Sequence, residues 1–441
     1  MRRYWPDRAQ RALGSTGLML LALFAACSDD EVIGNVGAPD GGVVPDGAPP
    51  APVPDAGASS DASDGDDADG GPALQCGEDG FCMTTPPSST SPAGQAVTLN
   101  DVWIDPDGKA WAVGHRADGF SLVLVFEAST WKVVYTGRLG SLTSISGVGR
   151  DEIWAAAGDR SLHGVTTNGT WEWTVTTFPP SAYVSSIWAS TSGDAWACGY
   201  LGILHFEDGA WSVSLSRGTA WDRNWTCSDV WGTDTGEVWA AMAYSFYDYE
   251  WEAYRSTYYL GRRFPGAEVD AGAADAGDDD GGDAGAIPDD GLGELDPASE
   301  DGWRIVPGTS SEENAYGTGF YVGNGVHWVL GRTMSTGHIG AMRSKLEDGK
   351  IVFDAFTEAV NAAGSPLVGQ YIQKFWATAN EIWGVGSFGV YHYDGQSWAL
   401  ARTAIDGMPL LALGQPNGIA GDANQIVVVG TNIALRREVK P

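Results

Sequence analysis

The sequence predicts an all-β chain folded as a seven-bladed β-propeller with four-stranded blades. First, a Trp-centred unit recurs along the 441 residues: Trp111, Trp154, Trp196 and Trp239 follow one another at intervals of 42 or 43 residues. Second, each unit consists of short apolar stretches separated by tight turns such as Asp208-Gly209. Third, 19 of the 20 Trp lie beyond residue 100, mostly at repeat positions. Repeats of this length with several short strands are typical of propeller blades.

The repeat occurs seven times, each time centred on one residue of its second strand. The seven centres are Trp111, Trp154, Trp196, Trp239, Trp328, Trp383 and Val428. The longer interval before Trp328 is one period plus an insertion. The last unit lacks a fourth strand, whereas residues 78–83 have the pattern of an isolated turn and fourth strand. We therefore expect this N-terminal strand to complete the last blade and close the ring.

Residues 1–27 have the pattern of a signal peptide. Four arginines precede an uncharged apolar stretch over residues 12–26, which is short for a membrane-spanning helix. Phe24-Ala25-Ala26-Cys27 resembles a bacterial lipobox, with Phe24 where Leu is usual. The alternative is a plain secretory signal with an incidental Cys. We expect lipidation at Cys27 and a lipid-anchored, extracytoplasmic protein of the cell envelope, either periplasmic or on the outer-membrane surface.

Two acidic segments flank or interrupt the repeats. Residues 28–75 contain eleven acidic and no basic side chains, and residues 266–300 contain twelve acidic and no basic ones. Such sequences bury too little apolar surface to fold, so we expect a disordered linker and a disordered insertion within blade 4 of a propeller domain over 76–441. The net charge of −32 argues against nucleic-acid binding, which depends on Lys and Arg.

Apart from Cys27, the chain contains four cysteines, an even number that permits two disulfides in an exported protein. Cys76 and Cys82 are close enough in sequence to close a small loop, which leaves Cys198 to pair with Cys227. A metal site is not expected, because the sequence has no CxxC spacing and only six scattered His.

The units also end alike, as in Asp208-Gly209-Ala210-Trp211 and Asp394-Gly395-Gln396-Ser397-Trp398. With strand motifs such as Ala110-Trp111-Ala112-Val113-Gly114, this pattern resembles the BNR/Asp-box propellers and the related photosystem-assembly-factor type, although the Asp-box is degenerate. The resemblance implies the propeller fold over residues 76–441 apart from the insertion. It implies no single function, because such folds include enzymes, assembly factors and binders.

Blade 4 contains the strongest candidate binding site. It consists of the long loop between the second and third strands of this blade and the loop that leads from blade 3 into its first strand, which we expect on the same face. Exposed aromatic side chains mixed with charges suit stacking on sugars or anchoring of a protein. The candidate residues are Trp221, Arg223, Trp225, Tyr247, Tyr249, Glu250 and Trp251. The alternative is that these rings pack on one another to hold a long hairpin.

These features predict a binding module for a protein or carbohydrate partner, monomeric, without a cofactor and in contact with the membrane only through its anchor. One alternative is a sialidase-like glycosidase or lyase. Arg304 in Trp303-Arg304-Ile305-Val306-Pro307 is similar to a sialidase motif, but the sequence shows no second or third arginine at a matching motif. The other alternative is a purely structural envelope protein.

Overall fold

The computed structural model describes residues 75–84, 96–216, 223–248, 253–263, 302–306, 309–347, 350–367, 372–405 and 407–439. Contacts divide the chain into residues 1–69 and 70–441, and every described residue belongs to the second unit. The predicted linker and insertion lie outside the described residues, apart from Gln75. Among the described residues, no helix is long and apolar enough to cross a membrane.

Seven antiparallel sheets make up this unit, and we number them as blades 1 to 7 along the chain. Blades 1 to 3 are β2 (Val97–Ile104), β3 (Ala110–Arg116), β4 (Ser121–Glu127) and β5 (Thr130–Gly137); β6 (Ser144–Val148), β7 (Glu152–Ala157), β8 (Arg160–Thr167) and β9 (Thr170–Thr177); and β10 (Val184–Thr191), β11 (Asp194–Gly199), β12 (Gly202–Glu207) and β13 (Ala210–Ser216).

Blades 4 to 7 continue this pattern. They are β14 (Arg223–Gly232), β15 (Val238–Asp248), β16 (Ala253–Arg263) and β17 (Trp303–Ile305); β18 (Asn314–Gly323), β19 (Val326–Thr333), β20 (Ile339–Glu347) and β21 (Lys350–Phe353); β23 (Ile372–Ala377), β24 (Ile382–Gly386), β25 (Gly389–Tyr393) and β26 (Trp398–Leu400); and β27 (Pro416–Gly421), β28 (Gln425–Gly430), β29 (Ile433–Glu438) and β1 (Phe81–Met83). Blade 5 differs from the four-stranded prediction, because β22 (Thr357–Glu358) also pairs with β20. A one-turn helix, α1 (Leu410–Leu413), precedes β27.

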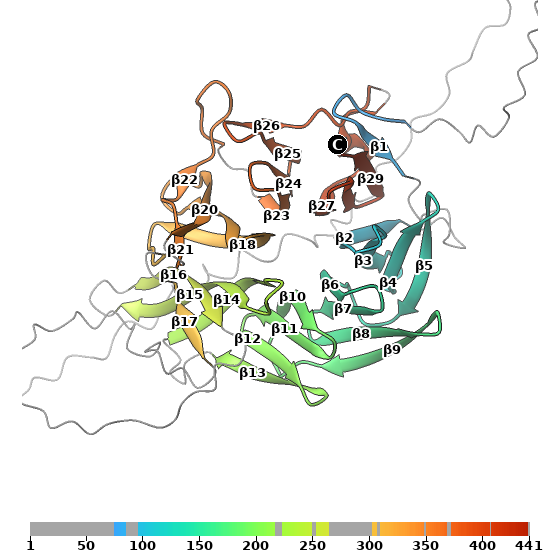
Figure 1. The fold of residues 1–441 in the computed structure, drawn as a ribbon, viewed down its shortest axis with the longest axis horizontal. Coiled ribbons are helices and arrows are strands. Elements are labelled where there is room, and N and C mark those ends of the chain that lie inside the picture. Colours follow the sequence, from blue (N-terminus) through green and yellow to red (C-terminus); the bar gives the residue numbers. More distant parts are fainter. Residues whose placement is uncertain are drawn as a thin grey trace, which may run out of the picture. The chain divides into compact units, whose positions relative to one another are not determined.

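The blades form a closed ring, as Figure 1 shows. The first strand of each blade contacts the first strand of the next, and β27 of blade 7 contacts β2 of blade 1. The apolar clusters lie between neighbouring blades: Trp111 of blade 1, for example, shares a cluster with Ile153 of blade 2. The predicted seven-bladed propeller is therefore confirmed.

The N-terminal strand closes the ring as predicted. β1 pairs with β29, with Phe81 opposite Arg437 and Met83 opposite Leu435. The side chain of Phe81 is 0% exposed and meets the indole of Trp383 in blade 6 edge-on, with ring centroids 5.5 Å apart. Blade 7 is thus assembled from both ends of the propeller domain, and its outer strand seals the contact with blade 6.

Close packing of the inner strands explains two of the glycines. Gly232 of β14 lies against the indole of Trp188 in blade 3, and Gly319 of β18 lies against Trp231 in blade 4. A Cβ atom at either glycine would overlap the indole, so a first-strand Trp is matched by a glycine on the next blade.

Buried polar groups also link the inner strands. Asp229 of β14 accepts a hydrogen bond from Ser186 Oγ of blade 3 at 2.5 Å and another from Thr318 Oγ1 of blade 5 at 2.6 Å. On blade 1, the Asp101 carboxylate accepts the Ile145 N–H of blade 2 at 3.1 Å. These bonds satisfy carboxylates whose burial would otherwise be unfavourable, and they fix neighbouring blades in register.

A Trp–His–carboxylate cluster recurs in three blades and was not predicted from the sequence. In blade 2, Trp154 stacks on His163 with centroids 3.8 Å apart, and Glu152 Oε1 bonds Trp154 Nε1 at 2.9 Å and His163 Nε2 at 3.0 Å. Blades 3 and 6 repeat it with Asp194, Trp196 and His205, and with Glu381, Trp383 and His392. Burial opposes ionisation of Glu152, yet hydrogen bonds from Ser192, Gly193 and Trp154 hold its pKa below the ordinary value.

Candidate functional site

The predicted binding residues fall mainly on and around the hairpin that β15 and β16 form in blade 4. Its two strands have eleven residues each, whereas the equivalent β11 and β12 of blade 3 have six. Pairing is continuous from Val238 opposite Arg263 to Asp248 opposite Ala253. Each strand of the hairpin is therefore five residues longer than its counterpart in blade 3, as expected from the long connection in the sequence.

A disulfide holds the base of this hairpin to the neighbouring blade. Cys227 of β14 is bonded to Cys198 of β11, with Cα atoms 5.2 Å apart. Cys198 is 0% and Cys227 6% exposed, so the bond lies in the cluster between blades 3 and 4. The other predicted disulfide, Cys76–Cys82, is also present. Both pairings are confirmed.

Trp225 belongs to the buried base of the hairpin, which corrects its assignment as a contact residue. Its indole is 4% exposed and packs against Tyr244 at 4.8 Å and Tyr259 at 5.5 Å. Strand β14 already begins at Arg223, so Trp225 occupies an inward position of a strand rather than a loop position. For this residue the alternative interpretation, packing within a long hairpin, is the correct one.

The structure describes only parts of the other candidates. The backbone of Arg223 pairs with Phe246 and that of Tyr247 pairs with Tyr254, which places both at the outer end of the hairpin. Trp221, Tyr249, Glu250 and Trp251 lie outside the described residues. Arg304, the residue behind the glycosidase alternative, is exposed on β17 opposite Arg262.

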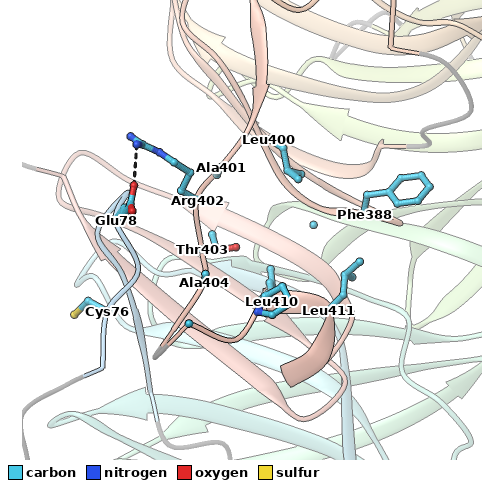
Figure 2. Close-up of a pocket in the computed structure, with 13 residues that line it drawn as sticks. Cys76, Glu78, Phe388, Leu400, Ala401, Arg402, Thr403, Ala404, Leu410 and Leu411 are labelled. Carbon is cyan, nitrogen blue, oxygen red and sulfur yellow. Dashed lines mark ion pairs between the residues drawn. The ribbon is translucent and has the colours of Figure 1, made fainter.

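A second feature, which the sequence did not suggest, is a groove between blades 6 and 7 (Figure 2). Its volume is about 720 Å³. Its lining comes from four separate stretches of chain: the loop at Cys76 and Glu78, the turn at Phe388, the end of β26 at Leu400, and the connection through Leu410 and Leu411. Most of these residues are apolar, and the charged groups, Glu78 and Arg402, lie together on one side.

Ion pairs form the polar side of the groove. Arg402 Nη1 lies 2.8 Å from Glu78 Oε2, and Arg402 Nη2 lies 3.2 Å from Asp79 Oδ1. The backbone N–H of Arg402 also donates to Asp79 Oδ2 at 2.6 Å. The loop closed by the Cys76–Cys82 disulfide is thereby fixed against the connection between blades 6 and 7. Within the part of the chain that the structure describes, no group of three His, Cys, Asp or Glu is placed to hold a metal ion.

Comparisons with known proteins find matches only among solved structures. No family model matches the chain, and no curated protein matches it. A structure described as YCF48 bound to D1 peptide is 16% identical with a TM-score of 0.49, covering 79% of this chain and 95% of that one. YCF48 from Cyanidioschyzon merolae is 15% identical, again with a TM-score of 0.49, and covers 81% and 98%. A virginiamycin B lyase from Staphylococcus aureus is 12% identical with a TM-score of 0.47, covering 78% and 95%. At these values we draw no functional argument from the similarity.

Proposed function

We propose that this protein is an extracytoplasmic binding module, tethered at Cys27, that uses the blade-4 hairpin to bind a protein or glycan partner. The observation that carries the proposal is the hairpin itself, whose strands are nearly twice as long as their counterparts in blade 3. The part of this extra length nearest the ring packs on Trp225 through Tyr244, and the two strands continue past that contact to Asp248 and Ala253. The sequence places aromatic residues at its outer end, at Tyr247, Tyr249 and Trp251.

The base of the hairpin favours tight binding because it is rigid. The Cys198–Cys227 disulfide and the stack of Trp225 on Tyr244 and Tyr259 restrain the strands that lead to the outer end. A preorganised surface loses less conformational entropy when a partner binds. Aromatic side chains on such a support provide large contact area and dominate binding energies, and Arg223 and Glu250 add polar contacts.

Two features support the proposed location. The first is the pair of disulfides, Cys76–Cys82 and Cys198–Cys227, because in most organisms disulfides persist only in oxidising compartments outside the cytosol. The lipobox-like Phe24-Ala25-Ala26-Cys27 supports an anchor at the end of the acidic linker. Metabolic palmitate labelling of the wild type and of Cys27→Ala tests the anchor. We expect label only in the wild type, and equal label or none in both would reject lipidation.

Binding is tested with the full chain on a glycan array and by capture of envelope proteins. The comparison is between wild type, a Tyr249→Ala/Trp251→Ala variant and Tyr183→Ala. Tyr183 is the matched control, because it is an aromatic residue 69% exposed in a loop of another blade. The proposal expects a glycan or protein retained by the wild type and by the control but at least tenfold less by the hairpin variant. Retention unchanged in the hairpin variant would refute it.

A further inference from the structure

We propose that the groove between blades 6 and 7 is a second interaction site, which binds an extended apolar segment of a partner protein flanked by Lys or Arg. This surface is separate from the blade-4 hairpin. Its apolar side chains are exposed, its volume admits several side chains, and an exposed carboxylate lies at its rim.

Three large apolar side chains border the groove and face solvent. Leu400 is 54% exposed, Phe388 50% and Leu411 46%. They come from three different stretches of chain, yet Figure 2 shows them around one hollow. Single exposed apolar residues are ordinary, but a cluster of them in a concave surface marks a site for a ligand or partner.

Folding alone does not account for this exposure. On β26, Trp398 is 4% exposed and supplies the core contact of the strand, while Leu400 faces outward. On α1, Leu410 is 4% exposed and anchors the turn, while its neighbour Leu411 faces outward. A polar residue at position 400 or 411 would leave the same core intact. The apolar choice therefore serves a contact outside the fold.

The size of the groove suits a few side chains of a bound segment. Its volume of about 720 Å³ lies in the range of sites that enclose a small ligand or a few side chains. One wall is the loop that the Cys76–Cys82 disulfide closes and that Arg402 fastens through Glu78 and Asp79. Because this wall is cross-linked, the groove exists before a partner arrives, which reduces the entropic cost of binding.

The charge of the rim selects the chemistry of the partner. Glu78 and Asp79 both pair with Arg402, and Arg437 Nε donates to the Asp79 carbonyl, so the exposed Glu78 is the acidic group of the lining that a partner can reach. Glu78 remains 72% exposed and is available to a cation. The net charge of −32 on the whole chain repels acidic partners, including a second copy, and attracts basic ones. In an apolar segment with basic flanks, the apolar side chains would pack in the groove and a Lys or Arg would pair with Glu78.

The test uses fluorescein-labelled peptides and the full chain, with binding followed by anisotropy. The peptide KKLFLKK is compared with EELFLEE, which reverses the flanks, and with KKSSSKK, which removes the apolar centre. We expect KKLFLKK to bind at least tenfold more tightly than either. Leu400→Asp and Phe388→Ala should weaken KKLFLKK at least tenfold. Val175→Asp, which changes a residue 44% exposed on blade 2, should leave its affinity unchanged.

Each part of the proposal has its own contrary result. Equal binding of the three peptides, or equal loss in Leu400→Asp and Val175→Asp, would overturn it. Glu78→Gln should reduce the preference for basic over acidic flanks, and an unchanged preference would remove the charge argument. Sedimentation that shows a dimer in the wild type and a monomer in Leu400→Asp would identify a second copy as the occupant instead. Tyr249→Ala/Trp251→Ala should bind KKLFLKK normally, so failure of this site is distinguishable from failure of the hairpin.

Discussion

Replacing Phe81 by Ala tests whether the N-terminal strand closes the ring. Phe81 is fully buried between blades 6 and 7, in edge contact with Trp383. A Phe→Ala change at such a position removes the buried ring and leaves a cavity, which costs about 3–5 kcal/mol. With a denaturant dependence of about 6 kcal/mol per molar guanidinium chloride for a domain of this size, the midpoint should fall by about 0.5–0.8 M.

Phe388→Ala is the matched control, because it makes the same chemical change at a residue 50% exposed. Its unfolding free energy should stay within about 0.5 kcal/mol of the wild type. Unfolding of the three full-length proteins is followed by tryptophan fluorescence, which reports on the Trp-rich contacts between blades. Equal midpoints for Phe81→Ala and Phe388→Ala would refute the reasoning, since they would mean that β1 does not contribute to the closed ring.

Three further predictions concern the supports of the fold. Replacing both Cys198 and Cys227 by Ala removes a bond between residues 29 positions apart and should lower the free energy of unfolding by about 3.6 kcal/mol. The same change at Cys76 and Cys82, which are 6 positions apart, should lower it by about 2.3 kcal/mol. Equilibrium unfolding measures both losses, and a larger loss at Cys76–Cys82 would contradict this order. Burial, and secondarily Arg262, lowers the pKa of His327 from its ordinary 6.5 to about 3. The unfolded chain therefore takes up this proton first, and stability is lost as the pH falls from 6.5 toward 3. The stability difference between wild type and His327→Gln should shrink by about 1.4 kcal/mol per pH unit in that window, and a pH-independent difference would exclude it. Replacing residues 266–300 by a short Gly-Ser turn should change the unfolding free energy by about 1–2 kcal/mol or less, because loop closure costs only about 0.6 kcal/mol per doubling of length; a large loss would show that the insertion packs on the ring.

The sequence predicted those features that depend on periodic or paired residues. The recurrence of Trp111, Trp154 and Trp196 identified the blades, because each indole fills the same inter-blade position. The unmatched strand at residues 81–83 and the missing fourth strand of the last unit predicted the closure of blade 7. In each case the signal was an element of the repeat that either recurs or is missing from one unit, and both can be seen in a single sequence.

The sequence did not show where one strand begins or which distant segments meet. Trp225 was taken for a loop residue, because nothing in Trp221-Asp222-Arg223-Asn224-Trp225 marks the start of a strand at Arg223. The groove joins Glu78 to Phe388 and Leu411, which follow it by more than 300 residues, and all three look like ordinary loop residues in isolation.

The Trp–His–carboxylate cluster did leave a signal in the sequence. Its acid and histidine are separated by 11 residues in all three blades, as in Glu152 and His163. That spacing could have found it, since it places the histidine opposite the Trp that follows the acid by two residues, and in a strand residues i and i+2 lie on the same face.

The most direct test of the binding proposal is photo-crosslinking in the intact envelope with benzoylphenylalanine in place of Tyr249. The same substitution at Tyr183, which is 69% exposed on another blade, is the control. If the outer end of the blade-4 hairpin is the contact surface, irradiation gives a discrete adduct from position 249 and none from position 183. Adducts of equal yield from both positions, or from position 183 alone, would contradict the proposal.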